Sequence, residues 1–271
     1  MRFAVLHACT YCYARASHAF LGYGPGEDFE REIFVKVNAP EVLRRELRRP
    51  SLRSETLTFG TISDPYQPVE TRYRLTRRLL GIAGDAGNPV SIMTKSTLAT
   101  QDLPLLTELA RTSGCAVNVT ITRLDEEVAR RLEPRTPRPA QRLRAVTALA
   151  EAGVPVEVFL APILPGITDG PGEIEALIGE AAAHGAGYVM ASPVRIGEGF
   201  ADPLLQSVAR DFPKMRTRYE RQARSGFMPA TDAARLTERV SAARDRAGLG
   251  SGPPRHLSRR PTQLGLDLRI A

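Results

Sequence analysis

Residues 154–162, VPVEVFLAP, form an almost continuous apolar run that is rich in β-branched residues. A strand with one solvated face alternates apolar and polar residues, and this stretch does not. We therefore expect a parallel strand that is covered on both faces. A helical pattern over residues 172–184 follows it. Together the two stretches predict one strand–helix unit of an α/β protein.

The same unit recurs along the chain in both directions. Further strands are expected at residues 2–6, 56–60, 89–94, 116–122 and 187–192, and helices near 70–83, 101–111, 125–132, 138–152 and 202–223. Strands begin about every 25–40 residues, the interval of repeated βα units. Neither GxGxxG nor GxxxxGK[ST] occurs in the sequence. The pattern favours an α/β fold with parallel strands, a partial (β/α)6 TIM-type barrel, over a doubly wound sheet.

Composition divides the chain into three parts. Residues 1–225 hold the βα units and predict one barrel domain, and residues 226–247 predict a helical extension. Residues 248–271 are rich in Gly, Pro, Ser and Arg before they end in a small apolar cluster. We expect this last part to be a flexible basic linker with a terminal motif.

Charge and hydropathy limit the classes of protein. The 271 residues are 42% hydrophobic and 25% charged, as in ordinary globular proteins. No segment approaches the roughly 18 apolar residues of a membrane span, and the short apolar N-terminus lacks the features of a secretory signal. We expect a cytoplasmic protein with no membrane partner. The net charge of +7 comes almost wholly from arginine, which either suits phosphate recognition or reflects the codon usage of a GC-rich genome.

The stretch HACTYCYAR, residues 7–15, holds two of the three cysteines, Cys9 and Cys12. Three cysteines do not make a disulfide framework, so a metal or redox site is the leading interpretation. A zinc site needs about four ligands, and no second pair has the right spacing. A thioredoxin-like redox pair and two inert buried thiols stay open as alternatives.

Five segments together resemble the spore photoproduct lyase-like, or DNA repair photolyase-like, branch of the radical S-adenosylmethionine proteins. They are CTYCYAR (9–15), TFGTISDPYQPVE (58–70), SIMTKS (91–96), RRLEPRTPRPAQRL (130–143) and APILPGITD (161–169). The resemblance runs from residue 7 to about residue 223. It implies an enzyme with a [4Fe-4S] cluster and S-adenosyl-L-methionine, in which reductive cleavage yields a 5′-deoxyadenosyl radical.

The first motif cysteine is replaced by Val5, four residues before Cys9. Valine cannot ligate iron, His7 is too near Cys9 to substitute, and Cys115 opens a strand at the end opposite the cofactor. Either the N-terminus is deduced incorrectly or the protein has diverged toward a weak or absent cluster. For the chain as it stands we expect a labile cluster.

The resemblance also implies roles for particular residues. Cys9 and Cys12 would bind the cluster, and Tyr13 would take part in hydrogen transfer. The S-adenosylmethionine contacts would be Tyr11, Ser63, Asp64, Lys95, Asn118, Thr120, Pro162 and Leu164. Asp64 would accept from the cofactor amine and Lys95 would pair with its carboxylate. From the residues alone, an Asx-type turn at Asp64 and a solvated strand end at Lys95 are the preferred interpretations, and the resemblance favours the functional roles instead.

The resemblance implies DNA as substrate and a flavodoxin- or ferredoxin-type reducing partner. The branch's hydrogen-donating cysteine has no counterpart in TFGTISDP, so strict thymine-dimer lyase activity is not expected. A peptide or small-molecule substrate, and a cluster-less binding barrel, stay open as alternatives. Residues 263–268, QLGLDL, resemble the bacterial sliding-clamp-binding motif, or else form an apolar patch that folds back on the barrel.

Overall fold

The computed structural model describes residues 7–197 and 199–250. Its sheet consists of β1 (Leu57–Phe59), β2 (Val90–Thr94), β3 (Cys115–Thr120), β4 (Val156–Ile163) and β5 (Tyr188–Pro193). All neighbouring strands are parallel, and their spatial order is their chain order, β1-β2-β3-β4-β5. A doubly wound sheet would reverse this order partway, so the sheet is the wall of a partial barrel.

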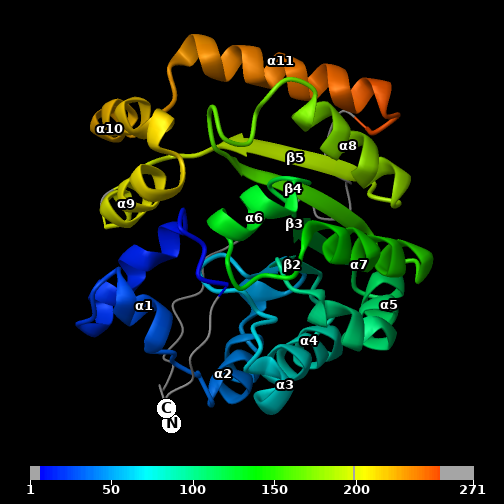
Figure 1. The fold of residues 1–271 in the computed structure, drawn as a ribbon. Coiled ribbons are helices and arrows are strands. Elements are labelled where there is room, and N and C mark those ends of the chain that lie inside the picture. Colours follow the sequence, from blue (N-terminus) through cyan, green and yellow to red (C-terminus); the bar gives the residue numbers. More distant parts are fainter. Residues whose placement is uncertain (1–6, 198, 251–271) are drawn as a thin grey trace.

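Helices cover one face of this wall and both of its ends (Figure 1). The α-helices are α1 (Glu27–Arg31), α2 (Ala39–Glu46), α3 (Glu70–Tyr73), α4 (Leu75–Asp85), α5 (Leu103–Arg111), α6 (Glu126–Leu132), α7 (Pro139–Glu151), α8 (Glu173–Ala183), α9 (Ala201–Asp211), α10 (Arg216–Ser225) and α11 (Ala230–Arg246). Short 3-10 segments are η1 (Tyr13–Leu21), η2 (Pro50–Leu52), η3 (Thr97–Asp102) and η4 (Pro213–Met215). None of these described helices is long and apolar enough to cross a membrane.

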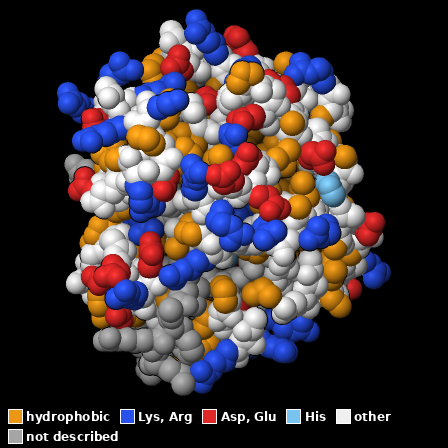
Figure 2. All heavy atoms as spheres, viewed as in Figure 1, with side chains coloured by type: hydrophobic (Ala, Val, Ile, Leu, Met, Phe, Trp, Pro, Cys, Tyr) orange, Lys and Arg blue, Asp and Glu red, His pale blue; other side chains and the backbone are white. Residues whose placement is uncertain are grey.

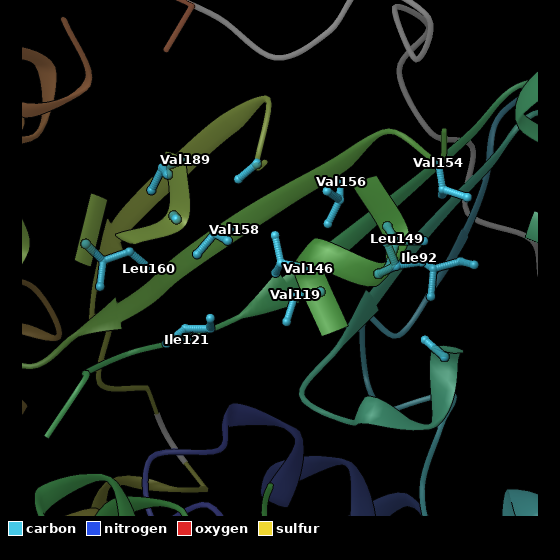
Figure 3. Close-up of a cluster of buried hydrophobic side chains, with 14 of the residues drawn as sticks. Ile92, Val119, Ile121, Val146, Leu149, Val154, Val156, Val158, Leu160 and Val189 are labelled. Atoms are coloured by element: carbon cyan, nitrogen blue, oxygen red, sulfur yellow. The ribbon is translucent and has the colours of Figure 1, made fainter. Parts of the chain in front are cut away.

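The apolar core lies between the sheet and the covering helices (Figure 3). Val117 and Val119 of β3, and Ile121 just after it, join this core together with Val146 and Leu149 of α7. Each fully buried aliphatic side chain of this kind contributes roughly 1.5–3 kcal/mol. Because successive strand residues point to opposite faces, their alternate neighbours Asn118, Thr120 and Thr122 face the inside of the partial barrel.

The structure confirms the expected strands between residues 56 and 192, and a single helix at 172–184. Two helices expected as continuous are broken. The one at 70–83 divides at Arg74, whose φ of +47° is left-handed, and the one at 202–223 divides where Pro213 opens η4. Proline lacks the N–H that continues a helix, and a left-handed residue ends one. The strand expected at 2–6 and the tail from 251 lie outside the described residues.

Candidate active site

The cysteine loop lies at the edge of the sheet where the parallel strands end (Figure 1). Cys9 is buried and Cys12 is half-buried, and the amide of Cys12 donates to the Cys9 carbonyl at 3.3 Å. Ala8, just before the pair, has a left-handed φ of +50°. This tight turn brings both thiols onto one short loop.

The Arg15 side chain stabilises the cysteine loop through hydrogen bonds to its backbone. Its Nε and Nη2 both donate to the Cys9 carbonyl, at 3.3 and 3.2 Å, while Nη1 donates to the Pro25 carbonyl at 3.0 Å. The guanidinium also pairs with Glu30 at 2.6 Å and lies 5.0 Å from the centre of the Phe29 ring. The planar fork of arginine makes these contacts together, which lysine cannot do.

The segment RRLEPRTPRPAQRL docks the loop onto the barrel. The amide of Thr10 donates to the Leu132 carbonyl at 2.9 Å, and the Tyr11 hydroxyl donates to the Glu133 carboxylate. Glu133 is in turn paired with Arg142, and both side chains are 1% exposed. A buried carboxylate is tolerated only when it is paired and hydrogen-bonded, and Glu133 satisfies both conditions.

The charged groups around this junction shift one another's pKa values. Burial alone would raise the pKa of Glu133, but Arg142 and Lys95 outweigh it and lower that pKa to about 2. Burial raises the pKa of the Cys9 thiol to about 12, with Lys95 opposing the rise. Burial lowers the pKa of Lys95, yet the neighbouring acidic groups of Cys9 and Glu133 outweigh it, and the net shift is upward. Lys95 is therefore an ammonium at neutral pH.

The Lys95 ammonium has no hydrogen bond or ion pair to any residue that the structure describes. Its Nζ lies 5.7 Å from the centre of the Tyr11 ring, directly beside the cysteine loop. A cation held in a half-buried position without a carboxylate partner is free to receive one from a ligand.

Asp64, by contrast, is fully engaged by the protein. One carboxylate oxygen accepts from the Tyr66 amide at 2.9 Å and the Thr94 hydroxyl at 2.6 Å. The other accepts from the Lys95 amide at 2.7 Å and lies 3.2 Å from His7 Nδ1. Burial raises its pKa, but His7 and these donors outweigh burial and lower it. The bond to Tyr66 is the Asx-type turn, so Asp64 ties the cysteine loop to the ends of β1 and β2.

The remaining expected cofactor contacts lie on the same side of the sheet. Asn118 is buried and donates to Ser91 Oγ and the Ile92 carbonyl, both at 3.1 Å. Thr120 is buried two residues further along the same face. Leu164, after β4, is fully buried in the apolar cluster that contains Cys9 and Tyr11. Pro162 is half-buried near the end of β4.

Tyr13 and Ser63 lie on the rim rather than inside. Tyr13 is 60% exposed, and its hydroxyl donates to the Thr61 carbonyl in the loop after β1. Ser63 is exposed on that loop. The loop begins at Gly60, where φ is +99° and a Cβ would collide with the Met93 carbonyl oxygen. Only glycine allows this close approach of β1 to β2.

The described residues supply only part of a cluster's ligand set. Cys9 and Cys12 offer two thiols on one loop, and no group of three His, Cys, Asp or Glu side chains suited to a metal occurs within the described residues. Cys115 is buried in the helix-side core at the start of β3, the end opposite Thr120. Val5 lies outside the described residues. The surroundings of Cys9 and Cys12 fit S-adenosylmethionine, because the Lys95 ammonium is placed to receive a carboxylate. They fit a [4Fe-4S] cluster less well, because the sequence supplies only two of the three thiolates there.

Sequence reasoning missed Arg15, Glu133 and Arg142 as residues that shape the site. Their only signal was that they fall inside segments quoted for the resemblance, CTYCYAR and RRLEPRTPRPAQRL. The contacts that give them a role join positions far apart in the chain, such as Tyr11 and Glu133.

Comparisons with known proteins agree with this geometry. The family model of the Radical SAM superfamily matches residues 6–178. An uncharacterized protein of Mycobacterium tuberculosis (strain H37Rv) is 40% identical over 236 residues, which is 87% of this chain and 69% of the relative. The Radical SAM Nalpha-GlyT isomerase of Pseudomonas phage M6 is 23% identical over 211 residues, 78% of this chain and 42% of that protein.

Among solved structures, spore photoproduct lyase complexed with dinucleoside spore photoproduct has the same fold. It superposes with a TM-score of 0.56 at 16% identity, over 88% of this chain and 70% of the lyase. The parallel sheet, the cysteine loop at its carboxyl edge and the family match together lead to one conclusion. The chain belongs to the radical SAM superfamily.

Proposed function

We propose that this protein binds S-adenosylmethionine at the carboxyl edge of the sheet and directs its radical chemistry at a nucleic acid. The observation that carries the proposal is the Lys95 ammonium, which pairs with no carboxylate of the described residues and lies 5.7 Å from the Tyr11 ring beside Cys9 and Cys12. A bound [4Fe-4S] cluster would supply the electron for C–S cleavage.

The residues of the chain would do the positioning. Lys95 would pair with the cofactor carboxylate, a charge-assisted contact that strengthens where water is excluded. Asp64 would keep the Lys95 backbone and the cysteine loop in register, and one of its donors would have to yield if it also accepts from the cofactor amine. Arg15 and Glu133 would fix the loop so that the thiols meet the iron without reorganisation.

The nucleic-acid substrate is supported by charge. The net charge is +7, with 37 basic residues against 30 acidic ones. A polyanionic substrate is attracted to such a surface, whereas a neutral small molecule gains nothing from it. The branch that this chain resembles has a hydrogen-donating cysteine near the segment that holds Thr61 and Ser63. This chain has no cysteine in that segment, so the proposed chemistry is not thymine-dimer lysis.

The test is anaerobic reconstitution of the full chain and of Val5→Cys, with iron and sulfide counting, dithionite reduction and measurement of 5′-deoxyadenosine. Val5→Cys completes a CxxxCxxC spacing with Cys9 and Cys12, and Val5→Ser is the matched control. We expect a stable four-iron cluster and 5′-deoxyadenosine from Val5→Cys, and a labile cluster from the unchanged chain and from Val5→Ser. A Val5→Cys chain that holds no four-iron cluster would overturn the proposal.

A further inference from the structure

The segment after β5 carries an exposed pair of an arginine and an aromatic side chain. Arg195 is exposed, and its guanidinium carbon lies 4.6 Å from the centre of the Phe227 ring. Phe227 is 55% exposed, although a phenylalanine gains most by burial. Resting on the function proposed above, we propose that Arg195 and Phe227 form a stacking platform for an unpaired base of single-stranded nucleic acid.

The platform is held in place by its backbone. The amide of Ile196 donates to the Gly226 carbonyl at 2.9 Å, and Gln222 Nε2 donates to the Val194 carbonyl at 3.3 Å. Gly226 has a φ of +74°, which lets the chain turn sharply from α10 into Phe227. Because the backbone on both sides is held before a ligand arrives, only the side chains of Arg195 and Phe227 lose conformational entropy on binding.

The platform lies on the rim of the candidate active site. Val194 and Ile196 are buried in the same apolar cluster as Cys9 and Tyr11, while Arg195 between them is exposed. Arg195 also follows the carboxyl end of β5, and the carboxyl ends of parallel strands share one edge of the sheet. In Figure 1, α10 and the cysteine loop accordingly lie on the same side of the molecule.

The surface beside the platform carries uncompensated positive charge. Lys214, Arg221 and Arg224 are exposed and pair with no carboxylate of the described residues. Two of the described acids on or after α10 are already paired, Glu220 with Arg216 and Asp232 with Arg218. Figure 2 shows basic side chains over the upper left of the molecule, where α10 lies.

Cations next to an exposed ring fit single-stranded nucleic acid better than other polyanions. The phosphates of a strand would meet the basic side chains, and an unpaired base would stack on the free surface of the ring or the guanidinium plane. A duplex hides its base faces, and an acidic peptide would use the cations without the ring. The platform would thus hold a base that neighbours the one presented to the active site.

The test measures the binding of a fluorescein-labelled oligothymidylate to the full chain by fluorescence anisotropy across a salt series. The test variants are Phe227→Leu, Phe227→Tyr and the double variant Arg221→Ser/Arg224→Ser. The control is Arg78→Ser/Arg144→Ser, which removes two exposed arginines from α4 and α7 that have no carboxylate partner among the described residues. Circular dichroism melting checks that each variant is folded.

We expect Phe227→Leu to weaken binding about tenfold and Phe227→Tyr to retain it, because stacking needs a ring. Arg221→Ser/Arg224→Ser should reduce the slope of log Kd against log salt by about 1.4, and the control should not. Equal binding by Phe227→Leu and wild type would overturn the platform, as would preference for duplex or a Phe227-dependent affinity for polyglutamate. These assays need no cluster. If binding by the wild-type chain does not depend on Phe227, only the platform fails. If the wild-type chain binds no nucleic acid, the proposed substrate fails too.

Discussion

Cys9 and Cys115 are both buried thiols, yet they lie in two regions of opposite character. Cys115 stands in the apolar helix-side core, where burial alone raises its pKa to about 12. Cys9 stands among Lys95, Glu133 and Arg142 at the carboxyl edge, and their charges act on it as well as burial. The difference teaches that burial alone does not distinguish the candidate site. What distinguishes it is a cluster of neighbouring charges in which one cation, Lys95, has no carboxylate partner within residues 7–197 and 199–250.

The largest expected effect comes from breaking the charge cluster that supports the cysteine loop. Glu133→Gln leaves Arg142 buried without its partner, so the free energy of unfolding should fall by about 3–5 kcal/mol. Urea denaturation measures it. The control is Glu127→Gln in the exposed Glu127–Arg131 pair, where about 0–1 kcal/mol is expected. Equal losses in the two variants would contradict the account.

The same carboxylate predicts how stability depends on pH. Its pKa falls from 4.5 to about 2 on folding, so its contribution is complete above about pH 4.5. That contribution is lost as the pH falls from about 4.5 toward 2. Urea midpoints measured between pH 7 and pH 3 should decline in wild type and decline less in Glu133→Gln. Parallel curves would exclude this role.

An intermediate effect is expected from removing the positive charge of Lys95. Lys95→Met should weaken S-adenosylmethionine binding by about ten- to hundredfold, because a charge-assisted hydrogen bond contributes about 1.5–3 kcal/mol. Isothermal titration calorimetry measures this, with Lys36→Met, an exposed lysine on another segment, as control. Wild-type affinity in Lys95→Met would mean that the ammonium does not meet the cofactor.

The smallest expected effect sharpens the role of Arg15. Arg15→Lys keeps the charge but loses the fork on the Cys9 carbonyl, and we expect a loss of about 1–2 kcal/mol in unfolding free energy. Thermal melting measures it, and the cysteine loop should also become more susceptible to limited proteolysis. Unchanged melting and proteolysis would show that Arg15 does not brace the loop.

Most of the fold follows from local pattern. The strands at 89–94 and 154–162 can be predicted from nearly continuous apolar runs, as expected for strands covered on both faces. The strand at 116–122 can be predicted from its β-branched residues, although Asn118, Thr120 and Thr122 alternate with apolar residues along it. The helix breaks at Arg74 and Pro213 were harder to foresee. Arginine rarely adopts a positive φ, and a proline is compatible with the first turn of a new helix as well as with the end of an old one.

The site was only partly predictable. Parallel topology brings the ends of β1 and β2 together, so the proximity of Asp64 and Lys95 to the cysteine loop follows once the barrel is assumed. The saturation of Asp64 by four protein contacts does not, because it depends on side-chain geometry. The Tyr11–Glu133 bond joins distant positions and has no local signature.

The most direct test of the contrast between the two thiols is 5′-deoxyadenosine formation by the reconstituted Val5→Cys chain, with Cys9→Ser or Cys115→Ser added. The account predicts that Cys9→Ser abolishes S-adenosylmethionine cleavage and that Cys115→Ser leaves it unchanged. Cleavage that survives Cys9→Ser would contradict a cofactor site at the carboxyl edge of the sheet.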